Sequence, residues 1–246
     1  MFFIAATLPL SELLSFGDSG YGDELFWAAL RTLEISALGY AFGLALGLLG
    51  ALGKISGGPW LAQVIGIYTT LFRALPELIL IMLLYYAGTD GVNRLLAGLG
   101  FGAVQINGMA AAVFVLGIVQ GAYSTEVLRA AINAVPLGQL EAASALGMSA
   151  ALRFRRITLP AMLPHAIPGL SNLWLNITKE SALISVVGFT ELALATQQAA
   201  GVSKRYFVLY VVAQCIYLAI SMVSGWGFGV AERYLRRGEK PRMGAA

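Results

Sequence analysis

The sequence predicts an all-α integral membrane protein, and two observations support this: the composition and the length of the apolar runs. Of the 246 residues, 58% are hydrophobic and 12% are charged, and the mean hydropathy is +0.76. Water-soluble domains carry roughly 25% charged residues, so this chain has too little polar surface to face water on every side. The apolar runs are long enough to cross a bilayer as helices, and they lack the two-residue alternation of a transmembrane β-barrel.

Five apolar runs are expected to be membrane spans, within a single transmembrane domain that covers residues 1–246. Each approaches or exceeds the roughly 20 residues that a helix needs to cross the hydrocarbon core. Beside the runs, this domain has a leading segment at 1–24, a loop at 133–164 and a tail at 235–246. The runs are residues 25–52, 61–88, 106–132, 163–189 and 206–234.

The basic residues between the spans predict the orientation. With the N-terminus outside, nine Lys and Arg residues fall on inner segments and three on outer segments. Because inner segments carry the excess of positive charge, we expect the segment 1–24 outside and the C-terminus inside. The outer residues are Arg94, Lys204 and Arg205. The inner residues are Lys54, Arg153, Arg155, Arg156, Arg233, Arg236, Arg237, Lys240 and Arg242.

Glycines recur every fourth residue within three of the runs. Such stripes let two helix backbones approach closely in a membrane. We predict that they pack between helices, with the lining of a solute pathway as the alternative. The stripes are Gly39, Gly43 and Gly47, then Gly117 and Gly121, then Gly225 and Gly229.

The residue inventory leaves little for metal binding or for contact with nucleic acid. The chain has one histidine, His165, and one histidine cannot build a metal cluster. Its one cysteine, Cys215, lies in an apolar run and is expected to be packed and inert. The net charge of +3 comes from basic residues that flank apolar spans, so membrane lipid rather than nucleic acid is the expected surrounding.

The loop at 133–164 is predicted to contain a short helix. Pro136 can open this helix, residues 139–146 are rich in Ala, Leu and Glu, and Gly147 can end it. One small, weakly apolar face then consists of Leu140, Ala143, Ser144 and Gly147. A face of this kind fits a groove on another protein; an interfacial helix that rests on lipid is the alternative.

The residues of this loop also carry a resemblance. Glu141, Ala142 and Ala143 are followed, after three intervening residues, by Gly147. After nine more intervening residues come Ile157, Leu159 and Pro160. Their order and spacing resemble the EAA loop of permease subunits of bacterial binding-protein-dependent ABC importers. The resemblance extends over most of residues 25–235. Three further stretches look like the polar amino acid subfamily, and most like its histidine, lysine and arginine or opine Q-type chains: LFRALPELILIMLLYY, GAYSTEVLRAAINAVPLGQ and KESALISVVGFTELALATQQ.

The resemblance implies a type I ABC importer permease fold in which this loop is a cytoplasmic coupling helix. Carried over to this chain, Glu141, Ala142, Ala143 and Gly147 form the surface that docks into an ATPase, within a motif that Ile157, Leu159 and Pro160 complete. The implied partners are a homologous M-type permease chain, two ATPase subunits and a periplasmic solute-binding protein, in a bacterial inner membrane. The sequence contains no G-x-x-x-x-G-K-[ST] motif. ATP and Mg are therefore expected on the separate ATPase, with no catalytic residue and no cofactor in this chain.

Polar residues inside the spans are the candidates for a substrate pathway, because ionisable groups are costly in a membrane. The candidates are Glu77, Glu126, Asn172 and Asn176. Pairing with a base within four residues is the alternative for the acids. Glu77 stands out because it follows Pro76, where the resembling permeases are commonly apolar, and an acid at a break in a span attracts a cationic group. The adjacent Lys179 and Glu180 match a pair typical of the subfamily and say little about the substrate.

These observations predict an ATP-driven importer subunit for polar solutes, with basic amino acids or opines as the expected substrates. One alternative is a subunit of an ion-coupled secondary transporter, which also places charges in interrupted spans but has no need of a loop that docks to an ATPase. The other is an integral membrane enzyme, which needs convergent nucleophile, base or metal groups. One His and one Cys supply few of these.

Overall fold

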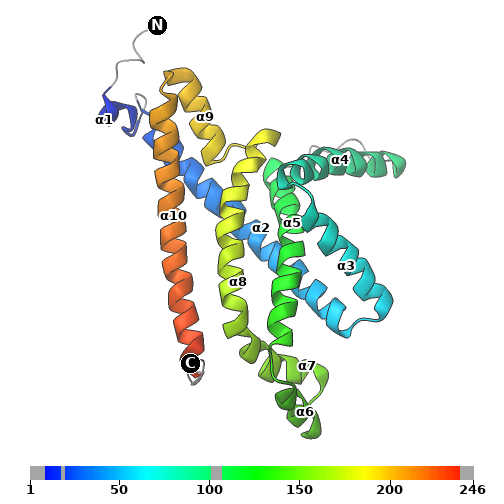
Figure 1. Cartoon of the computed structure of the whole chain (residues 1–246). Coiled ribbons are helices and arrows are strands. Elements are labelled where there is room, and N and C mark those ends of the chain that lie inside the picture. Colours follow the sequence, from blue (N-terminus) through cyan, green and yellow to red (C-terminus); the bar gives the residue numbers. More distant parts are fainter. Residues whose placement is uncertain (1–8, 18–19, 101–106, 239–246) are drawn as a thin grey trace.

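The computed structural model describes residues 9–17, 20–100 and 107–238, and in these residues the protein is helical with no strand (Figure 1). The predicted all-α class is confirmed. Several predicted features lie outside the described residues: residues 1–8 and 18–19 of the leading segment, the first residue of the run at 106–132, and Lys240 and Arg242 in the tail.

The described helices follow one another through short connections. The α-helices are α1 (Leu10–Leu13), α2 (Gly22–Ser56), α3 (Pro59–Ala74), α4 (Glu77–Gly98), α5 (Gly108–Asn133), α6 (Leu137–Ala145), α7 (Ala150–Arg153), α8 (Leu159–Glu180), α9 (Leu192–Ser203) and α10 (Tyr206–Leu235). A π-helical turn, η2 (Phe154–Thr158), joins α7 to α8, and two 3₁₀ segments, η3 (Ser181–Val187) and η4 (Arg236–Gly238), follow α8 and α10.

Three described helices are long and apolar enough to cross a membrane on their own: α2, α5 and α10. The bent pair α3 and α4 counts as a fourth candidate span only if the two helices are taken together. Helix α8 is not apolar enough to count as a candidate. The described residues therefore hold three or four candidate spans by length and composition, where the sequence predicts five. Figure 1 shows α2, α5 and α10 running in one sense while α3 and α8 return.

The predicted span at 61–88 is not one continuous helix, because the chain bends by 116° between α3 and α4. Leu75 ends α3 in an extended conformation, with φ −95° and ψ 148°. A residue before proline is driven out of the helical region by the proline ring, and proline itself has no N–H to continue the helix. Pro76 therefore ends one helix and precedes the first turn of the next, so that Glu77 is the first residue of α4.

The centre of the fold is the close packing of α2 against α5. Gly39, Gly43 and Gly47 are buried. A Cβ atom built on Gly43 would stand 2.8 Å from the Gln120 Cβ, and one on Gly47 would stand 2.3 Å from the Ser124 Cβ. The paired numbers rise together along both helices, so α2 and α5 are parallel. The predicted packing role of this stripe is confirmed.

The other two stripes differ from each other. A Cβ on Gly117 would lie 2.2 Å from a ring atom of Phe42, and one on Gly121 would lie 3.0 Å from the Leu46 Cβ, so this stripe packs as predicted. Gly225 on α10 has no atom within 4 Å of such a Cβ. The predicted packing at Gly225 is therefore wrong within this chain, because this side of α10 faces away from the other described helices.

We expect Gly47→Ala to destabilise the protein by about 1–3 kcal/mol, because its new Cβ overpacks against the Ser124 backbone and side chain. Gly225→Ala is the matched control, and it should leave stability unchanged or slightly raised, since alanine favours the helix and meets no neighbour. Thermal unfolding midpoints of the purified variants in detergent measure the difference. Equal midpoints for the two variants would contradict the α2–α5 packing.

Candidate functional site

Two acidic side chains meet at the break between α3 and α4. Glu77 begins α4 and Glu180 ends α8, and the two carboxyl groups are within hydrogen-bonding reach of each other. The Tyr123 hydroxyl of α5 donates to the Glu77 Oε1 at 3.3 Å. Like charges side by side repel unless a proton or a cation lies between them. We call Glu77, Tyr123 and Glu180 the acidic cluster, and its composition suits a cationic group.

The base nearest to Glu77 in sequence does not neutralise this cluster. The Arg73 guanidinium lies over the Tyr123 ring, 5.8 Å from its centre, which is a cation–π contact. Among the described residues, no ion pair joins Arg73 to Glu77. The intrahelical pairing that spacing allows is therefore absent here, because the break at Pro76 puts Arg73 and Glu77 on different helices.

Two of the predicted pathway residues share a face of α8 with Glu180. Asn172, Asn176 and Glu180 follow one another at four-residue intervals on a continuous helix, which places them on one side. Asn172 is exposed and Asn176 is half-buried. They form a polar stripe that leads to the acidic cluster, and amide groups of this kind can hydrogen-bond a polar solute.

Lys179 and Glu180 point in different directions, as adjacent helical residues do. Glu180 reaches the acidic cluster, whereas Lys179 lines a separate hollow beside α10 together with Gln214, Tyr217 and Ser221. Lys179 and Glu180 therefore form no direct ion pair, although the Lys179 charge is close enough to act on Glu180.

Glu126 has a different environment from Glu77. Its carboxylate accepts hydrogen bonds from the Lys54 Nζ at 2.5 Å and from the Arg129 Nε and Nη2 at 3.0 and 2.9 Å. The Lys54 Nζ also donates to the Thr69 hydroxyl at 2.9 Å. The predicted pairing of Glu126 with Arg129 is confirmed. The Lys54–Glu126 ion pair joins α2 to α5, and the Lys54–Thr69 hydrogen bond joins α2 to α3. Because both cations already occupy this carboxylate, Glu126 serves packing in the described arrangement.

The predicted short helix in the loop is confirmed as α6. Pro136 precedes it, and Gly147 follows it with φ +75°, a conformation that favours glycine. Glu141 and Ala142 are exposed. The connection then passes through α7 and η2 into α8, where Leu159 packs on the core and Pro160 lies in the first turn.

The face predicted to dock on a partner is only partly available. Ala143 is 3% exposed, and Leu140 packs on the core formed by α5 and α8. Arg153 donates a hydrogen bond to the Ser144 hydroxyl. Ala143 and Leu140 are therefore turned toward their own chain, which corrects the predicted outward face at these two residues, whereas Ser144 and Gly147 are exposed as predicted. The outward side presents Glu141 and Ala142.

A buried carboxylate that sequence reasoning missed is Glu191, which is 0% exposed. Its Oε1 caps α9 by accepting from the Ala193 and Leu194 backbone N–H groups at 2.7 and 3.1 Å. Its Oε2 accepts from the Tyr217 hydroxyl at 2.8 Å and lies 3.1 Å from the Thr32 hydroxyl. This carboxylate joins α2, α9 and α10. The one sequence signal for this cap is an acidic residue at the start of a helix, where negative charge is favourable. No sequence pattern indicates the Thr32 and Tyr217 partners.

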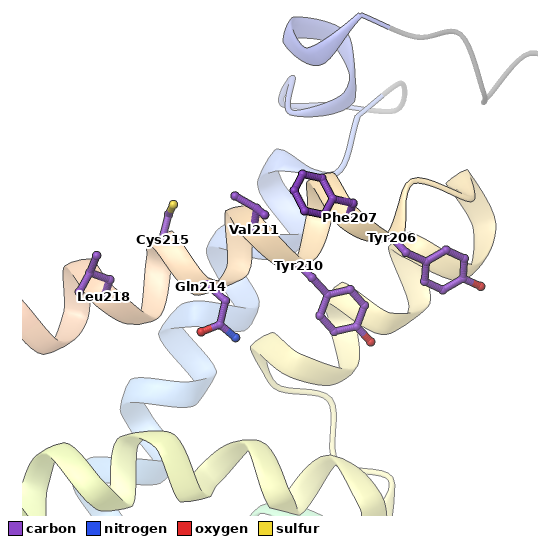
Figure 2. A pocket seen from close by; sticks show the side chains of 7 residues that line it. All are labelled: Tyr206, Phe207, Tyr210, Val211, Gln214, Cys215 and Leu218. Atoms are coloured by element: carbon purple, nitrogen blue, oxygen red, sulfur yellow. The ribbon is translucent and has the colours of Figure 1, made fainter.

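An apolar hollow along α10 is a poor candidate for a polar solute. Figure 2 shows Tyr206, Phe207, Tyr210, Val211, Gln214, Cys215 and Leu218 along its length. None of these side chains carries a formal charge. Cys215 is exposed there, so the prediction of a packed thiol is wrong.

Comparison with known proteins gives a family match. The model of the family described as binding-protein-dependent transport system inner membrane component matches residues 43–237. The nopaline transport system permease protein NocQ of Agrobacterium fabrum is 40% identical over 229 residues, which cover 92% of this chain and 97% of that protein. The histidine/lysine/arginine/ornithine transport system permease protein HisQ of Escherichia coli is 37% identical over 205 residues, covering 83% and 90% of the two chains.

Solved structures show the same fold. A crystal structure of an amino acid ABC transporter with histidines matches with a TM-score of 0.72 at 30% identity, covering 87% of this chain and 95% of that chain. An inward-facing structure of the MetNI methionine ABC transporter matches with a TM-score of 0.68, covering 88% and 96%. Its identity of 18% bears on the fold alone.

We expect Glu126→Ala to destabilise the protein by about 2–4 kcal/mol, because it leaves the largely covered Lys54 without a partner and also removes the ion pair of the partly exposed Arg129. Asp90→Ala removes an exposed i,i+4 pair with Arg94, whose side chains are 59% and 80% exposed, and should change stability by less than about 0.5 kcal/mol. Thermal unfolding of both variants in lipid nanodiscs provides the comparison. A Glu126→Ala midpoint no lower than that of Asp90→Ala would contradict the structural role of the Glu126 ion pairs.

Proposed function

The chain belongs to the family of binding-protein-dependent transport system inner membrane components, and we propose that within it this chain helps conduct basic amino acids or opines across a bacterial inner membrane. It has the type I ABC importer permease fold, and it is a membrane subunit of an ATP-driven importer. ATP hydrolysis belongs to a separate subunit in these systems. The rival interpretations, a secondary transporter and a membrane enzyme, are not favoured.

The acidic cluster is the observation that supports a cationic solute. It stands where a span is broken, and broken helices form the solute sites of many transporters. The Glu77 and Glu180 carboxyl groups reach each other without an intervening base, so an ammonium or guanidinium group would relieve their repulsion. The names of the matched relatives refer to nopaline and to histidine, lysine, arginine and ornithine. Asn172 and Asn176 extend the proposed path along α8.

We also propose five membrane crossings with the N-terminus outside. The parallel packing of α2 and α5 supports the count, because a return through α3 and α4 must separate two parallel spans. The described charges support the orientation: the end of the bundle that holds α6 and α7 carries Arg153, Arg155 and Arg156. That end is then cytoplasmic, and α9 lies at the periplasmic end.

At the cytoplasmic end, α6 is the proposed coupling helix. Its exposed side, with Glu141 and Ala142, would dock into the ATPase, while Ala143 anchors it from within. Gly147 turns the chain at a positive φ, and the segment with Ile157, Leu159 and Pro160 leads directly into α8. Because α8 also ends at Glu180, a rigid shift of α6 would reach the acidic cluster through one helix.

The assembly that follows has one such permease chain beside a second, two ATPase subunits and a periplasmic solute-binding protein. We propose an M-type chain as the second permease, with ATP and Mg held by the ATPases alone. Only 11% of the most apolar stretch of α10 is buried within this chain. This largely uncovered helix supports a partner in the membrane.

We expect Glu77→Gln to lower the preference for basic over neutral solutes by about tenfold or more, because a charge-assisted hydrogen bond is worth about 1.5–3 kcal/mol. The measurement is solute-stimulated ATPase activity of the reconstituted complex with its binding protein, over a panel of amino acids and opines. Glu34→Gln, which changes an exposed acid of α2, is the matched control. A solute preference identical to wild type in Glu77→Gln would remove the acidic cluster from the pathway.

We expect Ala142→Asp to abolish solute-stimulated ATP hydrolysis, because it places an unpaired charge on the surface that would face the ATPase groove. Ala151→Asp adds the same charge to an exposed alanine of α7, outside the docking residues, and should leave coupling intact. Stimulated and basal ATPase rates report coupling, and co-purification of the ATPase reports docking. Full stimulation in Ala142→Asp would contradict the coupling assignment. These substitutions are preferable to a change at Gly147, whose positive φ makes any other residue strained.

A further inference from the structure

The second half of α4 leaves the helix bundle. In its first half, Ile81 packs in the core with Ala112 and Val115 of α5. Leu84 and Tyr85 contact the same core beside Met109, the second residue of α5. Beyond Tyr85, α4 has passed the first turn of α5, and residues 86–98 extend beyond the end of that helix. Figure 1 shows α4 running sideways at the level where α5 begins.

The exposed part of α4 is amphipathic. Asp90 and Arg94 form an ion pair at 2.9 Å, with side chains that are 59% and 80% exposed. At 100° per residue, Val92, Leu95 and Leu99 lie on the opposite side of the helix from Asp90. Leu95 is 70% exposed and Leu99 is 72% exposed. One side is therefore charged and the other is apolar, with no described part of the chain covering either leucine.

We propose that residues 86–99 lie along the boundary between membrane and water, with Val92, Leu95 and Leu99 in the lipid and the Asp90–Arg94 pair in water. A helix with segregated apolar and charged faces binds the plane of the interface. We assign lipid as the partner of the apolar face. The segment connects two membrane-embedded helices, α3 and α5, and therefore stays close to the bilayer surface.

The two other placements are costly. If α4 continued as a straight span, Asp90 and Arg94 would enter the hydrocarbon, where ionised groups are strongly disfavoured. If the segment extended into water, two leucines would lose a burial worth about 1.5–3 kcal/mol each. The 116° bend at Pro76 avoids both by laying the helix across the end of the bundle. The inference requires no particular solute, so it stands apart from the proposed transport of basic amino acids.

Site-directed spin labelling tests this placement. Cys215 is the one cysteine in the sequence, so Cys215→Ser gives a background for four single-cysteine variants, Asp90→Cys, Arg94→Cys, Leu95→Cys and Leu99→Cys. Each is labelled with a nitroxide in the assembled complex and reconstituted in vesicles of phosphatidylethanolamine and phosphatidylglycerol. Power saturation then compares contact with oxygen, which concentrates in lipid, and with a water-soluble nickel chelate. Phe114→Cys on α5 and Ala151→Cys on α7 are the lipid and water references.

We expect the ratio of oxygen to nickel accessibility to reverse between the two faces: high for labels at positions 95 and 99, low at positions 90 and 94. Nickel access at all four positions would overturn the proposal in favour of a helix in water. Protection from both reagents at positions 95 and 99 would overturn it in favour of a protein partner, and high oxygen access at all four would indicate a membrane span. Val92→Cys reports the apolar face if Leu95→Cys fails to assemble.

Discussion

The close approach of α2 and α5 is the constraint on which the rest of the structure depends. Three glycines of α2 let its backbone lie against α5, where Cβ atoms would stand closer to Gln120 and Ser124 than van der Waals contact allows. Without a hydrophobic driving force between helices in lipid, such packing is what holds a membrane fold together. Because the two helices are parallel, the chain must return between them, and α3 with α4 makes that return. The ion pairs of Lys54, Glu126 and Arg129 then fasten the end of α2 to α5 and, through Thr69, to α3.

The return path creates the proposed solute site. A proline that ends α3 also begins α4 at a sharp angle, which brings Glu77 toward Tyr123 and Glu180 and turns it away from Arg73. The same bend sends the rest of α4 along the edge of the bundle, where its charges and leucines separate onto opposite faces. One local backbone event therefore determines both the position of the acidic cluster and the surroundings of the segment that follows it. The end of α8 supplies the second carboxyl, and its beginning connects to α6, so one helix spans the distance between the proposed solute path and the proposed docking surface.

Polar contacts between helices decide which charged residues are available to a solute. Glu126 and Glu77 are both acids within apolar runs with a base nearby in sequence, yet Glu126 receives two cations and Glu77 receives a tyrosine and another carboxyl. Glu191 is different again, because its carboxylate is enclosed by donors from three helices. A buried carboxylate that accepts several hydrogen bonds is held in place and fixes its neighbours. These three environments separate Glu126 and Glu191, which are held by hydrogen-bond donors, from the carboxyl pair that is proposed to meet a cationic solute.

The sequence by itself determined the helical membrane class, the packing role of the first two glycine stripes, the short helix between Pro136 and Gly147, and the family, because hydropathy, small-residue spacing and a 20-residue motif are local patterns. Only the tertiary structure decided the angle at Pro76, the meeting of Glu77 with Glu180, the burial of Ala143 and the enclosure of Glu191. The physical reason is that each of these four features depends on which residues of a helix distant in sequence pack against the residue concerned. A proline marks where a helix ends but not the direction of the next one, and an acid in an apolar run does not reveal whether its partner is a lysine or a second acid.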